Sequence, residues 1–192
     1  MSGCSNVYRE LPKLVPTEKK LLPADPAQQE SLYRIWDEEV FPSFDPVPHW
    51  AYFYLLPHKH LLLDPLTRGV PWWEKATVNI CYPLTAAMIR KGLGIDAVTP
   101  PTQAQDTIRK GFDYLDKRLA DGRPYLMGDA LTVLDIGTAA LAAPAIFEPL
   151  YGEGGLLPPL EKTPAAMLPL IYELRERPAA RYITRIYQQH RL

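Results

Sequence analysis

The strongest evidence for the fold comes from one short run of residues, Gly128-Asp129-Ala130-Leu131-Thr132-Val133-Leu134-Asp135-Ile136. Thr132 can accept a hydrogen bond from the backbone N–H of Asp135, while the Asp135 carboxylate can accept one from the N–H of Thr132. This is a capping box with Asp in place of Glu, and Leu131 and Ile136 complete a hydrophobic staple across it. Because a buried helix cannot leave its first N–H groups to water, the stretch predicts the start of a helix inside a bundle.

The neighbouring segments strengthen this prediction. Val133 through Ala143 are small or apolar on nearly every side of a helix, which is typical of a helix in the middle of a bundle. Upstream, Thr102 to Asp121 predicts an amphipathic helix that ends at Gly122. Charged residues occupy its other faces, and its apolar stripe consists of Ile108, Phe112, Leu115 and Leu119.

Prolines punctuate the helices further out. Asp25 suits the cap and Pro26 the first position of a helix that we expect to reach Val40. Pro83 bends or breaks the next helix. The remaining expected helices are Trp73 to Lys91, Pro164 to Arg175 and Pro178 to His190.

The stretch from Phe41 to Trp73 has a different pattern. Six prolines interrupt an aromatic-rich sequence there, and this predicts extended structure or short helical turns. No other segment favours a strand. The sequence therefore predicts an all-α fold, a helical bundle.

The composition excludes several classes of function. The chain of 192 residues has a net charge of −1, and 47% of its residues are hydrophobic, as in ordinary globular proteins. The charge balance gives no basic face for a nucleic acid, and the apolar runs fall short of the ~18 residues of a membrane span. The N-terminus does not look like a secretory signal, and Cys4 and Cys81 fit a reducing compartment. We therefore expect no nucleic-acid partner, no membrane span, and a location in the cytoplasm or an organelle stroma.

The stretch around Thr132 and Asp135 also carries a resemblance to a known family. Together with Phe112-Asp113-Tyr114-Leu115 and the run from Leu119 to Leu126, it closely resembles the central helices of the glutathione transferase C-terminal domain. The C-terminal part of the chain, from Ala140-Leu141-Ala142-Ala143-Pro144 to Arg185-Ile186-Tyr187, is similar to a bacterial and plastid-lineage branch of that family. The resemblance covers roughly residues 21–192. It implies two parts: residues 1–26, the remnant of the last helix of a thioredoxin-like N-terminal domain plus a linker, and residues 27–192, the helical domain.

The resemblance also implies where glutathione would bind. In the family it lies mainly on the thioredoxin-like domain, and the roughly 20 residues before the linker are too few for that domain, so most of it is expected to be absent. The run from Cys4 to Leu11 looks like the Glu-Ser-Asn-x-Ile motif that opens the domain's last helix. Ser5, with Asn6 beside it, would then bind the γ-glutamyl carboxylate at a helix N-terminus. Cys4 replaces the acidic residue of the motif and is either a catalytic thiol at a helix start, where its pKa could be lowered, or an incidental one; no other catalytic residue is identified.

A second expected site is the family's variable pocket for hydrophobic substrates, beside the first helices of the C-terminal domain. The alternative for the aromatic residues there is core packing or a dimer surface. The candidate wall residues are Tyr52, Tyr54 and Trp72. No carboxylate or thiolate stands at a metal-ligand spacing from His49, His58 and His60, so we expect surface histidines and no metal.

Two functions remain open from the sequence. The first is a glutathione transferase-like protein, the hydrophobic-substrate-binding half of a glutathione-dependent transferase, with glutathione as cosubstrate if the missing domain is supplied and a small hydrophobic electrophile as ligand. The chain alone would then be weakly active or inactive, because a glutathione thiol needs donors or positive charge to ionise. The second is a non-catalytic binding or assembly subunit, with a partner protein or a second copy at the exposed interdomain surface.

Overall fold

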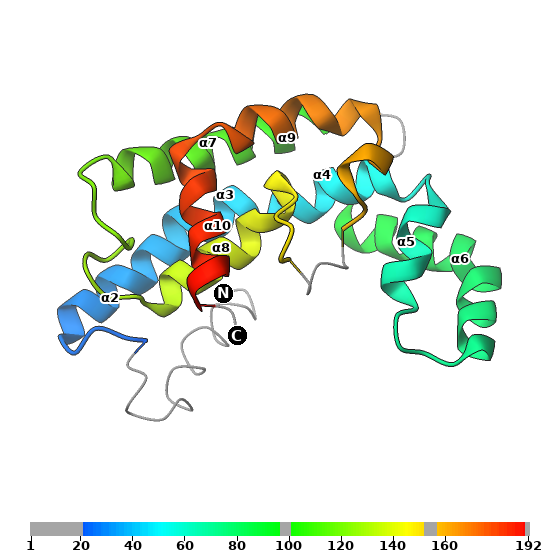
Figure 1. Ribbon diagram of the computed structural model, residues 1–192, viewed down its shortest axis with the longest axis horizontal. Helices are drawn as coiled ribbons and strands as arrows, with labels where there is room; N and C mark the ends of the chain where they lie inside the picture. Colours follow the sequence, from blue (N-terminus) through cyan, green and yellow to red (C-terminus); the bar gives the residue numbers. More distant parts are fainter. Residues whose placement is uncertain (1–20, 97–100, 152–156, 191–192) are drawn as a thin grey trace.

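The computed structural model describes residues 21–96, 101–151 and 157–190. Within these ranges the regular elements are helices and no strand forms, so the predicted all-α fold is confirmed (Figure 1). The main helices are α2 (Pro26–Ile35), α3 (Phe41–Phe44), α4 (Pro46–Leu55), α5 (Lys59–Leu66), α6 (Trp72–Leu93), α7 (Thr102–Leu119), α8 (Val133–Ile146), α9 (Leu168–Arg175) and α10 (Pro178–His190). The π-helical segment η2 (Trp36–Val40) joins α2 to α3, and the 3-10 turns η3 (Leu160–Lys162) and η4 (Ala165–Met167) precede α9.

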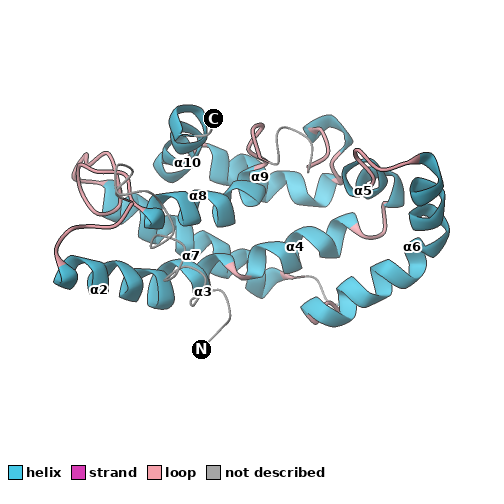
Figure 2. Cartoon of the chain, turned by 90° about the horizontal axis from the view of Figure 1, so that it is seen from below, coloured by secondary structure: helices cyan, strands magenta, loops and turns pink. Residues whose placement is uncertain are grey.

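The helices from α2 to α4 follow one another almost end to end and form the longest row of the bundle (Figures 1 and 2). The helix α7 runs antiparallel to this row, because Gln105 near its start contacts Tyr54 in α4, while Gly111 in its middle meets Phe44 in α3. The central helix α8 packs against α4, α9 and α10. It holds the largest share of small buried residues, as the sequence predicts.

The contact between α3 and α7 depends on a glycine. A Cβ at Gly111 would lie 2.8 Å from the Cβ of Ser43 and 3.0 Å from Cζ of Phe44. The phenyl ring of Phe44 packs edge-on against Phe112 with their centroids 5.7 Å apart. Gly111 therefore lets the two helices approach closely enough for these rings to interlock in the core.

Both ends of α8 are fixed by polar contacts. At its start the predicted capping box of Thr132 and Asp135 is present. At its end Phe147 adopts a left-handed backbone with φ 51°. The guanidinium of Arg175 donates hydrogen bonds to the carbonyls of Ile146 and Phe147, both at 2.7 Å, and so satisfies acceptors that the helix end leaves open.

The prediction of extended structure or short turns between Phe41 and Trp73 was wrong, because α4 and α5 are helices of 10 and 8 residues. A proline does not prevent a helix from forming when it stands in the first turn of that helix. Pro42 lies in the first turn of α3, and Pro46 and Pro48 lie in the first turn of α4. The first N–H groups of a helix have no intrahelical partner, so proline loses nothing there.

The helices α5 and α6 form a hairpin that projects from one end of the bundle, at the right of Figure 1. Pro83 inside α6 has no N–H for the carbonyl of Asn79, four residues earlier. The ammonium group of Lys59 donates to that carbonyl at 2.7 Å in its place. The hydroxyl of Tyr82 donates to the carbonyl of Leu56 at 2.9 Å, which ties α6 to the end of α4. The predicted helix is thus present and continues through Pro83. The carbonyl that lacks an N–H partner because of Pro83 accepts a hydrogen bond from α5 instead.

Candidate functional site

An apolar cavity of about 220 Å³ opens between α4, α5, α8 and the segment that follows α8. Pro48, Ala51, Tyr52 and Leu55 form one wall, because residues at spacings of three and four share a face of α4. The other lining residues are Val47, Leu62, Pro65, Ala140, Leu141, Pro144, Tyr151 and Leu157. Three prolines among them hold parts of this wall in fixed backbone geometry.

The chemistry of the lining restricts what the cavity can hold. Among the described residues that line it, none carries a charge, and the hydroxyl groups belong to Tyr52 and Tyr151. A charged ligand would lose its hydration without gaining a partner there. The cavity is therefore suited to a small neutral apolar compound with a few polar atoms, which is the usual pattern of small-molecule pockets.

The structure brings together only part of the predicted pocket. Tyr52 lines the cavity, but Tyr54 and Trp72 do not. The hydroxyl of Tyr54 instead accepts a hydrogen bond from Nε2 of Gln105 at 3.3 Å, and its ring packs edge-on against Trp50. Trp72 is 82% exposed at the start of α6. The fully buried Trp50 takes the alternative role of core packing.

Most of the wall is not predicted by the sequence. Pro48, Ala51 and Leu55 are absent from the predicted pocket, because the proline-rich stretch predicts irregular structure. Their spacing with Tyr52, at i, i+3, i+4 and i+7, is the pattern of one helix face and was the available signal. Leu141 lies in the predicted central helix and Pro144 directly follows it, but nothing local in the sequence distinguishes a pocket-lining residue from a core residue there.

The histidines do not form a cluster with other ligands. His49 points its Nδ1 at the carbonyl of Leu93, 3.1 Å away, and borders a second, more polar hollow between α4, α6 and the start of α7. His58 and His60 are exposed, with ring centroids 6.1 Å apart. Over the described ranges of the chain, no three His, Cys, Asp or Glu residues come together in a way that could hold a metal ion.

The capping residues Thr132 and Asp135 lie in the core and make their hydrogen bonds within the protein. The Asp135 carboxylate is fully buried and accepts from the N–H of Thr132 at 2.8 Å and from its hydroxyl at 2.7 Å. It also accepts from the N–H of Leu126 and the hydroxyl of Tyr182, each at 2.7 Å. Because the protein itself supplies four donors to this buried carboxylate, we assign the group to folding.

Ser5 and Asn6, which the resemblance assigns to glutathione, lie outside the described part of the chain. So does the candidate catalytic thiol, Cys4. The other cysteine, Cys81, is an exposed free thiol on α6. In the described residues, no helix is both long enough and apolar enough to cross a membrane.

Comparison with known protein families gives one match. The model of the family described as "Glutathione S-transferase, C-terminal domain" matches residues 85–165. This region runs from the second half of α6 through α7 and α8, and it includes the capping box. Searches of curated proteins and of solved structures gave no match. The helical architecture and the family match agree, and residues 85–165 of the chain match the C-terminal domain of the glutathione S-transferase family.

Proposed function

We propose that the chain is the hydrophobic-ligand-binding half of a glutathione-dependent transferase, and that the cavity between α4 and α8 receives the apolar cosubstrate. The observation that carries this proposal is that the described residues lining the cavity are uncharged, with Tyr52 on the wall, inside a domain of the glutathione S-transferase type. Burial of an apolar ligand there would release water from the prolines, leucines and valine of the lining, at about 25 cal/mol per Å² of apolar surface.

The tyrosines would give the cavity its selectivity. A hydroxyl of Tyr52 or Tyr151 can donate to a polar atom of the ligand, and such a contact orients a ligand that is otherwise held by apolar burial. Glutathione would supply the thiol. Its carboxylate would be held by Ser5 and Asn6, as the family resemblance implies, at the N-terminus of a helix.

A binding experiment tests the pocket. We expect the full chain to bind N-phenyl-1-naphthylamine, a neutral apolar fluorescent probe, and the variant Ala140→Phe to weaken that binding by about tenfold. Ala140 lines the cavity yet is solvent-exposed, so a phenyl ring there fills the space without disturbing the core. The matched control is Ile136→Phe, one turn earlier on α8 and 39% exposed. Equal affinities for the two variants would remove the cavity from the proposal.

A second experiment tests the glutathione half. Calorimetric titration with glutathione and a conjugation assay with a generic electrophile are run on the same preparation. We expect Ser5→Ala to weaken glutathione binding, since it removes the hydroxyl that would meet the γ-glutamyl carboxylate. If neither binding nor conjugation occurs while the apolar probe still binds, the chain acts as a non-catalytic binding subunit instead.

A further inference from the structure

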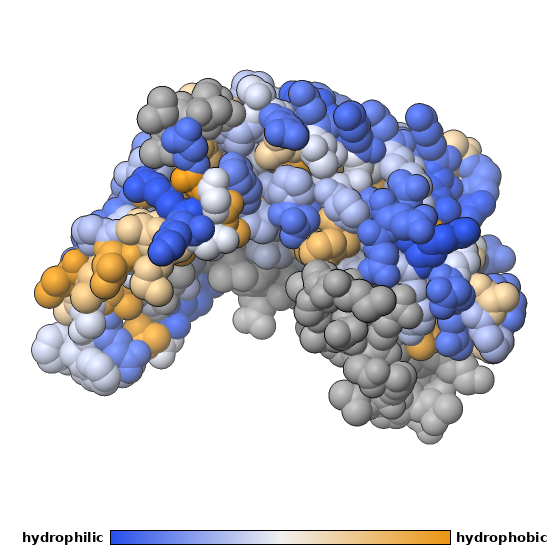
Figure 3. All heavy atoms as spheres, turned by 180° about the vertical axis from the view of Figure 1, so that it is seen from behind, coloured by the Kyte–Doolittle hydropathy of each residue, from blue (hydrophilic) through white to orange (hydrophobic). Residues whose placement is uncertain are grey.

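The exposed large hydrophobic side chains gather on the hairpin of α5 and α6. Six of the nine such side chains in the described ranges lie between residues 70 and 88. Figure 3 shows the apolar side chains of this region at the surface, at the lower left of the view. The six are Val70, Trp72, Trp73, Ile80, Leu84 and Met88, and their exposed fractions range from 36% to 82%. A concentration of this kind marks an interaction surface.

Four of these side chains form one stripe along α6. Trp73, Ile80, Leu84 and Met88 follow one another at spacings of seven, four and four, which places them on a single helix face. The opposite face buries Tyr82 and Ala86 against the hairpin and the bundle. A helix that is apolar on both faces is normally covered on both, and within the described residues the main neighbours of α6 are α4 and α5. The outer stripe is therefore built for a partner.

The charge of the hairpin indicates what kind of partner fits. Residues 59–93 contain five basic and two acidic residues and so carry a net charge of +3. Because the whole chain has a net charge of −1 by the same counting, the remaining residues carry −4. The basic residues are Lys59, Arg68, Lys75, Arg90 and Lys91, and the acidic ones are Asp64 and Glu74. The apolar surface and the positive charge thus coincide on one end of the molecule.

We propose that the α6 stripe, together with Trp72 at its start, docks peripherally on an anionic lipid surface. An interfacial helix of this type combines tryptophan and aliphatic side chains with lysine and arginine, and it lies in the plane of the headgroups. Tryptophan is favoured at that depth, and the long side chain of Lys91, which shares the helix face of Trp73 and Leu84, can reach the headgroups from the end of the stripe. Two copies of the hairpin placed face to face would instead bring two charges of +3 together. This docking is independent of ligand binding in the cavity.

Flotation of the full chain with vesicles tests the proposal. We expect binding to vesicles of phosphatidylcholine and phosphatidylserine mixed at about two to one, several-fold weaker binding to phosphatidylcholine alone, and weakening by salt. The double variant Ile80→Ser, Leu84→Ser should lower the partition coefficient by roughly tenfold or more, because both side chains leave the acyl boundary. Since both side chains are exposed, the fold should persist, and an unchanged circular dichroism spectrum checks it.

The matched control is Tyr172→Ser on α9, which removes an exposed large side chain outside the hairpin and should leave flotation unchanged. Equal flotation of the double variant and the unaltered chain would overturn the proposal. An absence of flotation would also overturn it. Light scattering would then show whether the chain is a monomer or a dimer, and whether the double variant separates the dimer. The dimer outcome would assign the stripe to a second copy of the chain.

Discussion

The hydroxyl of Tyr182 donates to Oδ1 of Asp135 at 2.7 Å and joins α10 to the first turn of α8 across 47 residues of sequence. The same carboxylate accepts from the N–H groups of Leu126 and Thr132 and from the Thr132 hydroxyl. Asp135 is fully buried, so its charge is stabilised by these four donors rather than by water. One side chain thus caps the central helix, fixes the preceding connector and anchors the last helix.

Replacing this carboxylate should destabilise the whole domain. In Asp135→Asn the amide must turn its NH₂ group toward N–H or hydroxyl donors, so at least one buried donor loses its partner. We expect the free energy of unfolding to fall by about 3 kcal/mol, measured by urea denaturation. Asp129 in the same connector is exposed, so Asp129→Asn should change the free energy of unfolding by less than about 0.5 kcal/mol. Equal unfolding midpoints for the two variants would contradict the assignment of Asp135.

The sequence predicted the local half of this arrangement. The capping box links residues three apart, so spacing alone indicates it. The Tyr182 contact could not be predicted, because it depends on how α10 lies across α8. The residues that line the cavity could not be predicted for a related reason. In an extended chain Tyr52 and Tyr54 would share one side, whereas on a helix they point about 200° apart, and only Tyr52 reaches the cavity.

The hydrogen bond from Lys59 to the carbonyl of Asn79 gives a second prediction. It tests whether this bond stabilises the protein because Pro83 has no N–H for the same carbonyl. We expect Lys59→Met to lower the free energy of unfolding by about 0.5–1 kcal/mol, since the carbonyl of Asn79 loses its donor. In a Pro83→Ala background the restored N–H can bond to that carbonyl, and the same change should cost close to nothing. Urea denaturation of the four proteins in this cycle measures the coupling. An equal cost of Lys59→Met in both backgrounds would show that the proline does not create the need for the lysine.

Tyr82 should make the stability pH-dependent in alkaline solution. Burial raises the pKa of its hydroxyl above the ordinary 10.0, although Arg90 acts in the opposite direction. The folded state therefore holds the proton more tightly than the unfolded state does. The stabilisation is complete below the unfolded pKa and is lost as the pH rises through the folded pKa.

Tyr82→Phe isolates this effect. At about pH 8 the variant should be less stable by about 1 kcal/mol, because the carbonyl of Leu56 loses its donor. The difference should shrink as the pH approaches about 11, since only the unaltered protein then deprotonates Tyr82 on unfolding. Tyr114, whose pKa is also raised by burial, is present in both proteins and does not contribute to the difference. A difference that stays constant over this range would rule out a pH-dependent contribution from Tyr82.

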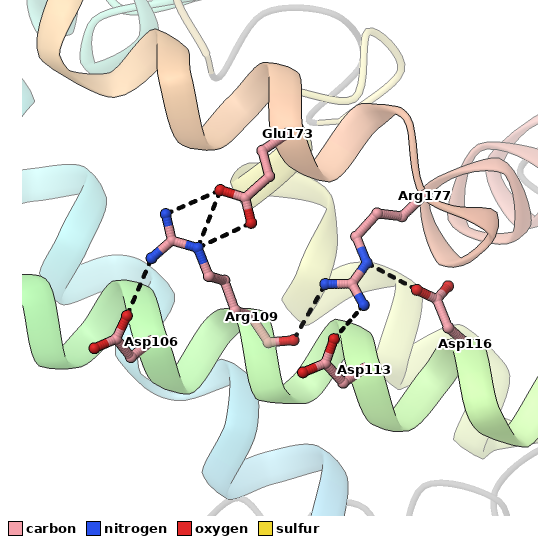
Figure 4. A network of polar contacts seen from close by, with 6 residues as sticks. All are labelled: Asp106, Arg109, Asp113, Asp116, Glu173 and Arg177. Atoms are coloured by element: carbon pink, nitrogen blue, oxygen red, sulfur yellow. Dashed lines mark hydrogen bonds and ion pairs between the residues drawn. The ribbon is translucent and has the colours of Figure 1, made fainter.

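The last prediction concerns Asp116, which binds Arg177 (Figure 4) and also caps a helix other than its own. Arg177 precedes α10 and has no side-chain oxygen that could cap it. Asp116 on α7 accepts instead from the N–H of Ala179 and from Nε of Arg177, each at 2.7 Å. Its side chain is 20% exposed, whereas that of Asp113, which also binds Arg177, is 53% exposed.

We expect Asp116→Ala to lower the free energy of unfolding by about 2 kcal/mol, and Asp113→Ala by less than about 1 kcal/mol, in urea denaturation. Added salt should reduce the smaller effect more, because water and ions screen the exposed pair while the backbone cap is a short, partly buried hydrogen bond. Asp106→Ala, at a 67% exposed carboxylate on the same helix, serves as the control for loss of one surface charge. Equal costs at Asp116 and Asp113 would mean that the charge of Arg177, and not the capping of α10, determines how the last helix is held on the bundle.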